Sequence, residues 1–99
     1  MIKHIVAWSH KDGFSDKQKL ENALKIKHGL ENLVGKIDGL IEAKVYINPL
    51  STSHRDAFLV SLFETEEALI AYRIHPEHKK VSSFVHETMD TRVCLDSVE

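Results

Sequence analysis

The stretch Asp56-Ala57-Phe58-Leu59-Val60-Ser61-Leu62-Phe63 decides the fold. It is rich in β-branched and aromatic residues, a composition that predicts a β-strand. Because successive side chains of a strand point to opposite faces, one face carries Phe58, Val60 and Leu62, and the other carries Leu59, Ser61 and Phe63. Both faces are largely apolar. One of them can pack against helices, and the other needs a covering surface of its own.

Strands are also predicted on either side of this stretch, at residues 2–8, 41–48 and 92–98. Ser15 and Gln18 have the spacing of a capping box, and apolar residues at intervals of three and four predict a helix that continues to about residue 37. Thr65 is positioned to cap a second helix. Pro76 ends that helix and is expected to start a short third one.

The resulting order is β-α-β-β-α-β, which defines an α+β, ferredoxin-like unit over residues 1–99 as a single domain. Helices on one side of a four-stranded sheet leave the other side bare. A large apolar surface of this kind is expected to mark an interface. We therefore expect a homodimer in which two sheet faces meet, forming a dimeric α/β barrel.

Composition narrows the function classes. The chain has 42% hydrophobic and 28% charged residues with a formal net charge of −2, and its Lys and Arg residues form no basic stripe, so nucleic-acid binding is not expected. No apolar run reaches the ~20 residues of a membrane span, and we expect a cytoplasmic protein that does not bind membranes. The only cysteine, Cys94, excludes an intrachain disulfide and is expected to be a small buried strand residue.

Three segments together resemble the stress-responsive A/B-barrel (Dabb) domain family. These are Ile2-Lys3-His4-Ile5-Val6, residues 56–64, and Ala71-Tyr72-Arg73-Ile74-His75-Pro76-Glu77-His78. The resemblance implies dimers that bring two sheets face to face. Most members have no assigned activity and some plant members are linked to stress tolerance. One member, olivetolic acid cyclase, closes a polyketide chain by an aldol condensation without a cofactor.

The resemblance also implies a candidate site. The catalytic Tyr and His of the cyclase match Tyr72 and His78, and a further pocket histidine matches His4. We add His75, from the same motif, to His4 as a candidate substrate-binding residue. Neither a cofactor nor a metal is implied, and the expected ligand is small and apolar or polyketide-like. Lys79-Lys80 and the loop at residues 48–54 depart from the cyclase, which leaves the substrate class open.

These residue types suit enolate chemistry, because a neutral imidazole can accept a proton and a phenol can hold a developing oxyanion. Purely structural roles are also open. Tyr72 and His4 can be core residues, and His75 can cap the helix that begins at Pro76. A metal on His75 and His78 would need a third ligand that the motif does not supply. His10, His28, His54 and His86 are expected at surface or loop positions.

Three functions therefore remain in view. The first is small-molecule binding or a cofactor-free cyclase- or lyase-like reaction. The second is a non-catalytic, stress-responsive dimeric module. The third is a cofactor-independent monooxygenase. A cavity lined by Tyr72 and His78 would favour the first, and side chains filling that space would favour the second.

Overall fold

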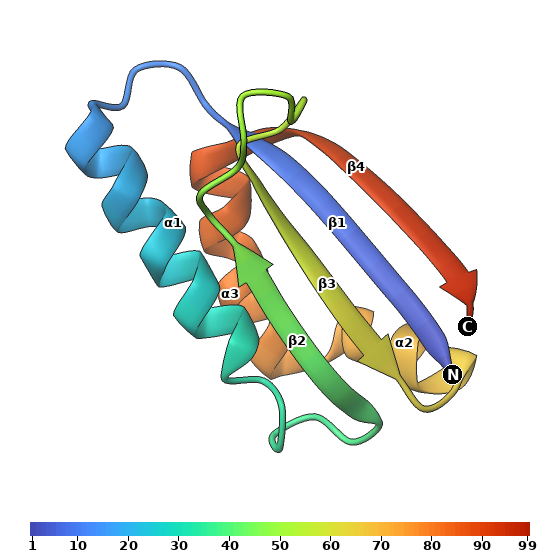
Figure 1. Cartoon of the computed structure of the whole chain (residues 1–99). Helices are drawn as coiled ribbons and strands as arrows, with labels where there is room; N and C mark the ends of the chain where they lie inside the picture. Colours follow the sequence, from blue (N-terminus) through green and yellow to red (C-terminus); the bar gives the residue numbers. More distant parts are fainter.

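A computed structural model describes residues 1–99 and shows seven elements in the predicted order (Figure 1). They are β1 (Ile2–His10), α1 (Asp16–Glu31), β2 (Leu40–Tyr46), β3 (Ala57–Phe63), α2 (Glu66–Ile74), α3 (Pro76–Thr88) and β4 (Met89–Val98). The ferredoxin-like α+β prediction is confirmed. No helix is both long and apolar enough to cross a membrane.

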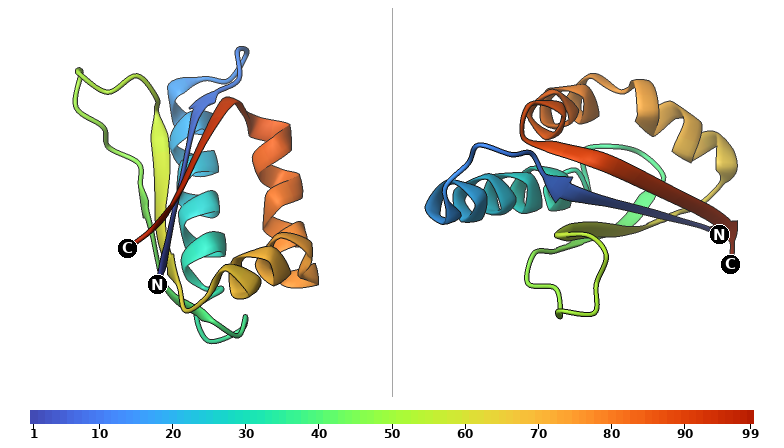
Figure 2. Two further views of the ribbon diagram at one scale, coloured as in Figure 1. Left: turned by 90° about the vertical axis from the view of Figure 1, so that its right-hand side faces the viewer. Right: turned by 90° about the horizontal axis from the view of Figure 1, so that it is seen from above.

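The four strands form one antiparallel sheet in the order β2-β3-β1-β4. The helices cover one face of this sheet, and the connection between β2 and β3 projects from the other (Figure 2). In the register, Val6 of β1 lies opposite Leu59 of β3 and Cys94 of β4. Residues far apart in the sequence thus share the helix-covered face near the middle of the sheet.

The predicted helix starts are confirmed, but the first helix ends at Glu31 and not near residue 37, because hydrogen-bonded turns carry Leu33 and Ile37 into the core. The Ser15 hydroxyl accepts a hydrogen bond from the Gln18 backbone at 3.2 Å, and the Gln18 side chain accepts one from the Ser15 backbone at 2.9 Å, which completes the capping box. Thr65 caps α2, and Pro76 begins α3. The third helix is not short, because it runs to Thr88 and buries Val85 against the core.

The core lies between the helices and the sheet. In β3 the burial alternates strictly, and Leu59, Ser61 and Phe63 are buried while Phe58, Val60 and Leu62 are not. The predicted division of this strand into two faces is therefore confirmed. The second face is the one without helices.

We call the sheet surface that carries Ile5, Phe58, Val60 and Leu62 the bare face. These side chains are only partly buried, and Leu95 of β4 on the same face is 61% exposed. At one border of this face, the Tyr46 ring stacks on Phe58 with ring centroids 4.8 Å apart. The bare face thus holds apolar surface that the chain itself does not cover.

Two sequence-based expectations need correction. The strand predicted at residues 41–48 begins at Leu40, and a register irregularity between Leu40 and Glu42 places Leu40 in the core and leaves Ile41 only partly buried. Cys94 is exposed rather than buried, because β4 is an edge strand and no helix covers it at that point. Strand alternation predicts the face on which a side chain lies. It does not predict whether that part of the face is covered.

Candidate functional site

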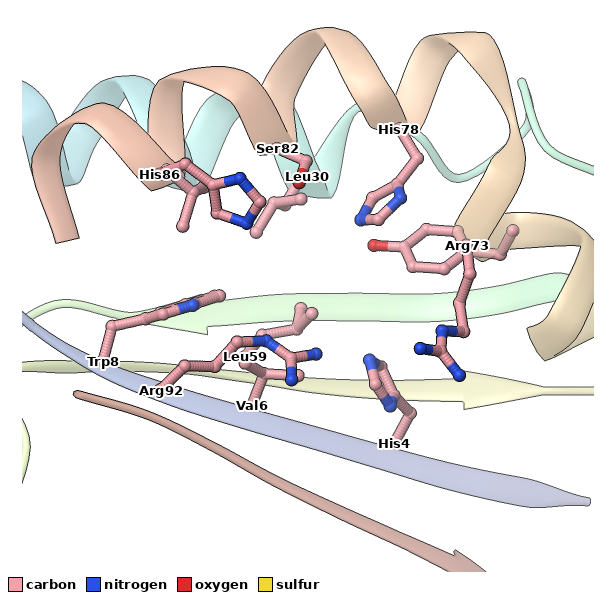
Figure 3. A pocket seen from close by; sticks show the side chains of 12 residues that line it. His4, Val6, Trp8, Leu30, Leu59, Arg73, His78, Ser82, His86 and Arg92 are labelled. Carbon is pink, nitrogen blue, oxygen red and sulfur yellow. The ribbon is translucent and has the colours of Figure 1, made fainter. Parts of the chain in front are cut away.

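A cavity of about 280 Å³ lies between α3 and the sheet (Figure 3). Residues from β1, β3, β4 and all three helices line it: His4, Val6, Trp8, Leu30, Leu59, Tyr72, Arg73, His78, Ser82, Val85, His86 and Arg92. Three of the four candidate residues from the sequence, His4, Tyr72 and His78, lie on this cavity. We refer to this space below as the cavity.

Tyr72 and His78 are brought together by the change of direction between two helices. Tyr72 lies in the last turn of α2 and His78 in the first turn of α3, and Pro76 between them starts the new helix. Their ring centroids are 4.1 Å apart, with the ring planes inclined by 31°. Phe63 packs edge-on against Tyr72 at 5.0 Å and fixes the phenol from the sheet side.

The surroundings set the protonation of both groups. Burial lowers the pKa of His78 below its ordinary value of 6.5, although the backbone carbonyl of Arg73 works in the opposite direction. Burial raises the pKa of Tyr72, while the charge of Arg92 works to lower it. The His78 Nδ1 atom is buried without a hydrogen-bond partner. At neutral pH the pair is therefore a neutral imidazole beside a protonated phenol.

His4 borders the cavity from the sheet. Its side chain is buried, its ring centroid is 6.3 Å from that of Tyr72, and its Nδ1 atom is hydrogen-bonded to Asp96, the residue opposite it on β4. Burial works to raise the pKa of Asp96, but the hydrogen bond and charge of His4, with smaller contributions from Cys94 and Arg73, outweigh it and hold this pKa below its ordinary value. The carboxylate therefore stays ionised and fixes the orientation of the imidazole.

A possible set of metal ligands surrounds His4. One ligand atom each from His4, Cys94 and Asp96 lie within 4.8 Å of one another, and the Cys94 Sγ atom is 3.8 Å from His4 Nδ1. Nitrogen, sulfur and oxygen ligands of this kind suit zinc. The set differs from the His75 and His78 pair considered from the sequence, because cross-strand pairing of β1 with β4 assembles it.

His75 does not line the cavity. Its Nδ1 atom accepts a hydrogen bond from the Glu77 backbone at 3.1 Å and thereby caps α3, which is the structural role that the sequence had left open. His86 was expected only at the surface; it is exposed and also lines the cavity.

Sequence reasoning missed Arg73 and Arg92, both of which line the cavity. One signal was available for β4. Arg92, Cys94 and Asp96 alternate along the strand, so they share one face. The sequence does not indicate that this face of β4 adjoins Tyr72. The register between β1 and β4 supplies that information.

The fold and site define a small ferredoxin-like protein with a side-chain-lined cavity between its sheet and its helices. The chain belongs to the stress responsive A/B barrel domain (Dabb) family, which it matches over residues 2–99. It is 30% identical over 96 residues to the stress-response A/B barrel domain-containing protein HS1 of Arabidopsis thaliana, covering 96% of this chain and 86% of that protein.

Solved structures show the same architecture. A dimeric protein of unknown function with a ferredoxin-like fold from Bacteroides fragilis superposes with a TM-score of 0.91 at 28% identity, covering 99% of this chain and 95% of that one. The hydroxynitrile lyase of Passiflora edulis superposes with a TM-score of 0.78 at 16% identity, covering 99% and 92%. The second similarity concerns the fold alone.

Proposed function

We propose that this Dabb protein is a homodimer whose cavity carries out cofactor-free, cyclase- or lyase-like chemistry on a small carbonyl compound. His78 acts as the general base, and Tyr72 donates a hydrogen bond to the oxygen that gains charge. One observation carries the proposal. A partly buried imidazole packs against a buried phenol on the wall of one cavity.

The reaction needs no outside oxidant or reductant. His78 removes a proton from a carbon next to a carbonyl, and the C–H electron pair forms a carbon–carbon double bond. The carbonyl oxygen becomes an enolate, which the Tyr72 hydroxyl stabilises. The enolate carbon then attacks a second carbonyl, whose oxygen becomes an alkoxide, as in a cyclase; alternatively, the enolate expels an oxygen substituent from the β carbon together with its bonding electron pair, as in a lyase. The imidazolium returns its proton to the oxygen that takes up the electron pair.

The protonation states support these roles. A base must be unprotonated at working pH, and burial lowers the pKa of His78. An oxyanion partner must keep its proton, and burial raises the pKa of Tyr72. His4, held by Asp96, is a positioning residue for the sheet side of the cavity. It presents a fixed polar edge against which a ligand can be oriented.

The dimer is supported by two observations. The bare face presents apolar side chains from β1, β3 and β4 that no element of the chain covers. The Bacteroides fragilis relative with this fold is described as dimeric. Two bare faces that pack against each other would remove this apolar surface from water, and the cavity on the opposite side of each sheet would stay open to ligands.

Hydrogen exchange on a neutral ketone tests the chemistry. Acetophenone in D₂O at neutral pD is followed by proton NMR, which reports loss of the methyl signal as its hydrogens exchange. We expect wild-type protein to accelerate this exchange over buffer, and His78→Gln to lose about a hundredfold, the usual contribution of a general base. His54→Gln changes an exposed loop histidine and is the control.

A wild-type rate equal to the buffer rate, or equal rates for wild type and His78→Gln, would contradict the proposed function. A second candidate would then take its place, namely a non-catalytic stress-responsive dimer. The observation that favours this candidate is the similarity to the Arabidopsis thaliana protein HS1, which is named for a stress response and not for a reaction.

A further inference from the structure

The wall of the cavity is strongly biased in charge. It includes two arginines and three histidines but neither Asp nor Glu. The four ion pairs of the chain join Lys3 with Glu99, His4 with Asp96, Lys27 with Glu31 and Lys80 with Glu77. Neither Arg73 nor Arg92 belongs to any of them. Two guanidinium groups thus border one small cavity without a carboxylate at ion-pair distance, although the charge of Arg73 contributes to the lowered pKa of Asp96.

The two arginines come from opposite sides of the cavity. Arg73 lies in the last turn of α2, next to Tyr72, and Arg92 lies on β4, on the helix-covered face of the sheet. Figure 3 shows both side chains extending into the space between α3 and the sheet. Asp96, the acidic residue farther along the same face of β4, is already hydrogen-bonded to His4. The arrangement therefore leaves guanidinium donors free for an anion from outside the chain.

Much of the remaining wall is apolar. Val6, Trp8, Leu30, Leu59 and Val85 also line the cavity, and all five are buried. A ligand that complements both the arginines and the apolar residues of the wall needs an anionic group joined to an apolar body. Planar guanidinium groups match the geometry of a carboxylate and can bind it through paired hydrogen bonds.

We infer that the ligand of this cavity is a small organic acid. Arg73 and Arg92 bind its carboxylate, and its apolar body packs against the wall that contains Trp8. This inference rests on the proposed function and deepens it by naming the substrate class. The carboxylate fixes one end of the ligand, so that a ketone elsewhere in the same molecule can lie beside the Tyr72 and His78 rings.

Benzoate and benzamide test this inference, because they share one shape and differ in charge. Each is titrated into the whole ¹⁵N-labelled protein at constant ionic strength, and the indole signal of Trp8, the only tryptophan, reports on the cavity. We expect benzoate to shift this signal and to bind at least tenfold more tightly than benzamide. Arg92→Gln and Arg73→Gln should each weaken benzoate binding at least fivefold, and Arg92→Lys should restore part of the loss.

Lys36→Gln is the control for overall charge, because Lys36 is exposed and lies outside the cavity. It should leave benzoate binding unchanged. Arg73 and Arg92 are exposed residues, so both variants should keep the wild-type pattern of dispersed amide signals. This pattern confirms folding in the same experiment.

Three results would overturn the inference: benzamide binding as tightly as benzoate, no effect of either compound on Trp8, or the same loss in Lys36→Gln as in the arginine variants. The exchange of acetophenone uses an uncharged probe, so its outcome is independent of these arginines. If benzoate and benzamide bind equally and acetophenone still exchanges rapidly, the inference of an organic-acid ligand is wrong, whereas the proposed function is retained.

Discussion

Replacing Val60 with lysine should separate the proposed dimer into folded monomers. Val60 lies on the bare face, opposite Ile5 of β1 and Lys44 of β2. Within one chain the new side chain is partly exposed, and its main cost is repulsion from Lys44, about 0.5 kcal/mol. In a dimer closed over this face, each lysine would lose its water at a cost of about 3 kcal/mol.

Because a two-fold interface contains the substitution twice, the cost to association is about 6 kcal/mol, or roughly four orders of magnitude in the dissociation constant. Sedimentation equilibrium at micromolar concentration measures it. We expect wild type at twice the chain mass of 11.3 kDa and Val60→Lys at the chain mass itself. Leu20→Lys, at a 53% exposed position on α1, should stay dimeric. A dimeric Val60→Lys variant would show that the bare face is not the interface.

Two further predictions concern stability. Burial lowers the pKa of His78, so the unfolded chain takes up a proton at a higher pH than the folded chain does. The free energy of unfolding should therefore be highest above pH 6.5 and should decrease as the pH falls through the lowered pKa. Urea unfolding between pH 5 and 8 should show this loss, and His78→Gln should reduce the slope; an unchanged slope would refute the assignment. Gly39→Ala should cost about 3 kcal/mol, because Gly39 has φ +84° and an added Cβ would lie 2.5 Å from that of Ala68. Gly13→Ala, with φ +97° but nothing within 4 Å, should cost about 1 kcal/mol in the same unfolding assay, and equal costs would contradict the packing argument.

Local patterns in the sequence predicted most of the fold. The alternation in β3, the capping box at Ser15 and the break at Pro76 each depend on neighbouring residues, and each is present in the structure. Errors arose where a distant element decides the outcome. Leu40, which precedes the predicted strand, lies in the core because the pairing of β2 with β3 is irregular there.

The candidate site was accessible from the sequence only in part. Tyr72 and His78 lie close together in the chain, and the motif that contains them drew attention to both. Arg92 and Asp96 join the site through the register of β4 against β1, which no local pattern encodes. His4 illustrates the same limit, because strand alternation gives its face but not its hydrogen bond to Asp96.

Histidine titration by NMR tests the central claim, that His78 is a partly buried, neutral base coupled to Tyr72. In wild type the His78 imidazole should titrate below 6.5, whereas exposed His54 should serve as the reference within the same sample. Tyr72→Phe removes a hydroxyl that can stabilise the imidazolium, so it should lower the His78 pKa further and leave His54 unmoved. A His78 that titrates like a free imidazole in both proteins would contradict the coupling, and with it the assignment of His78 as the base.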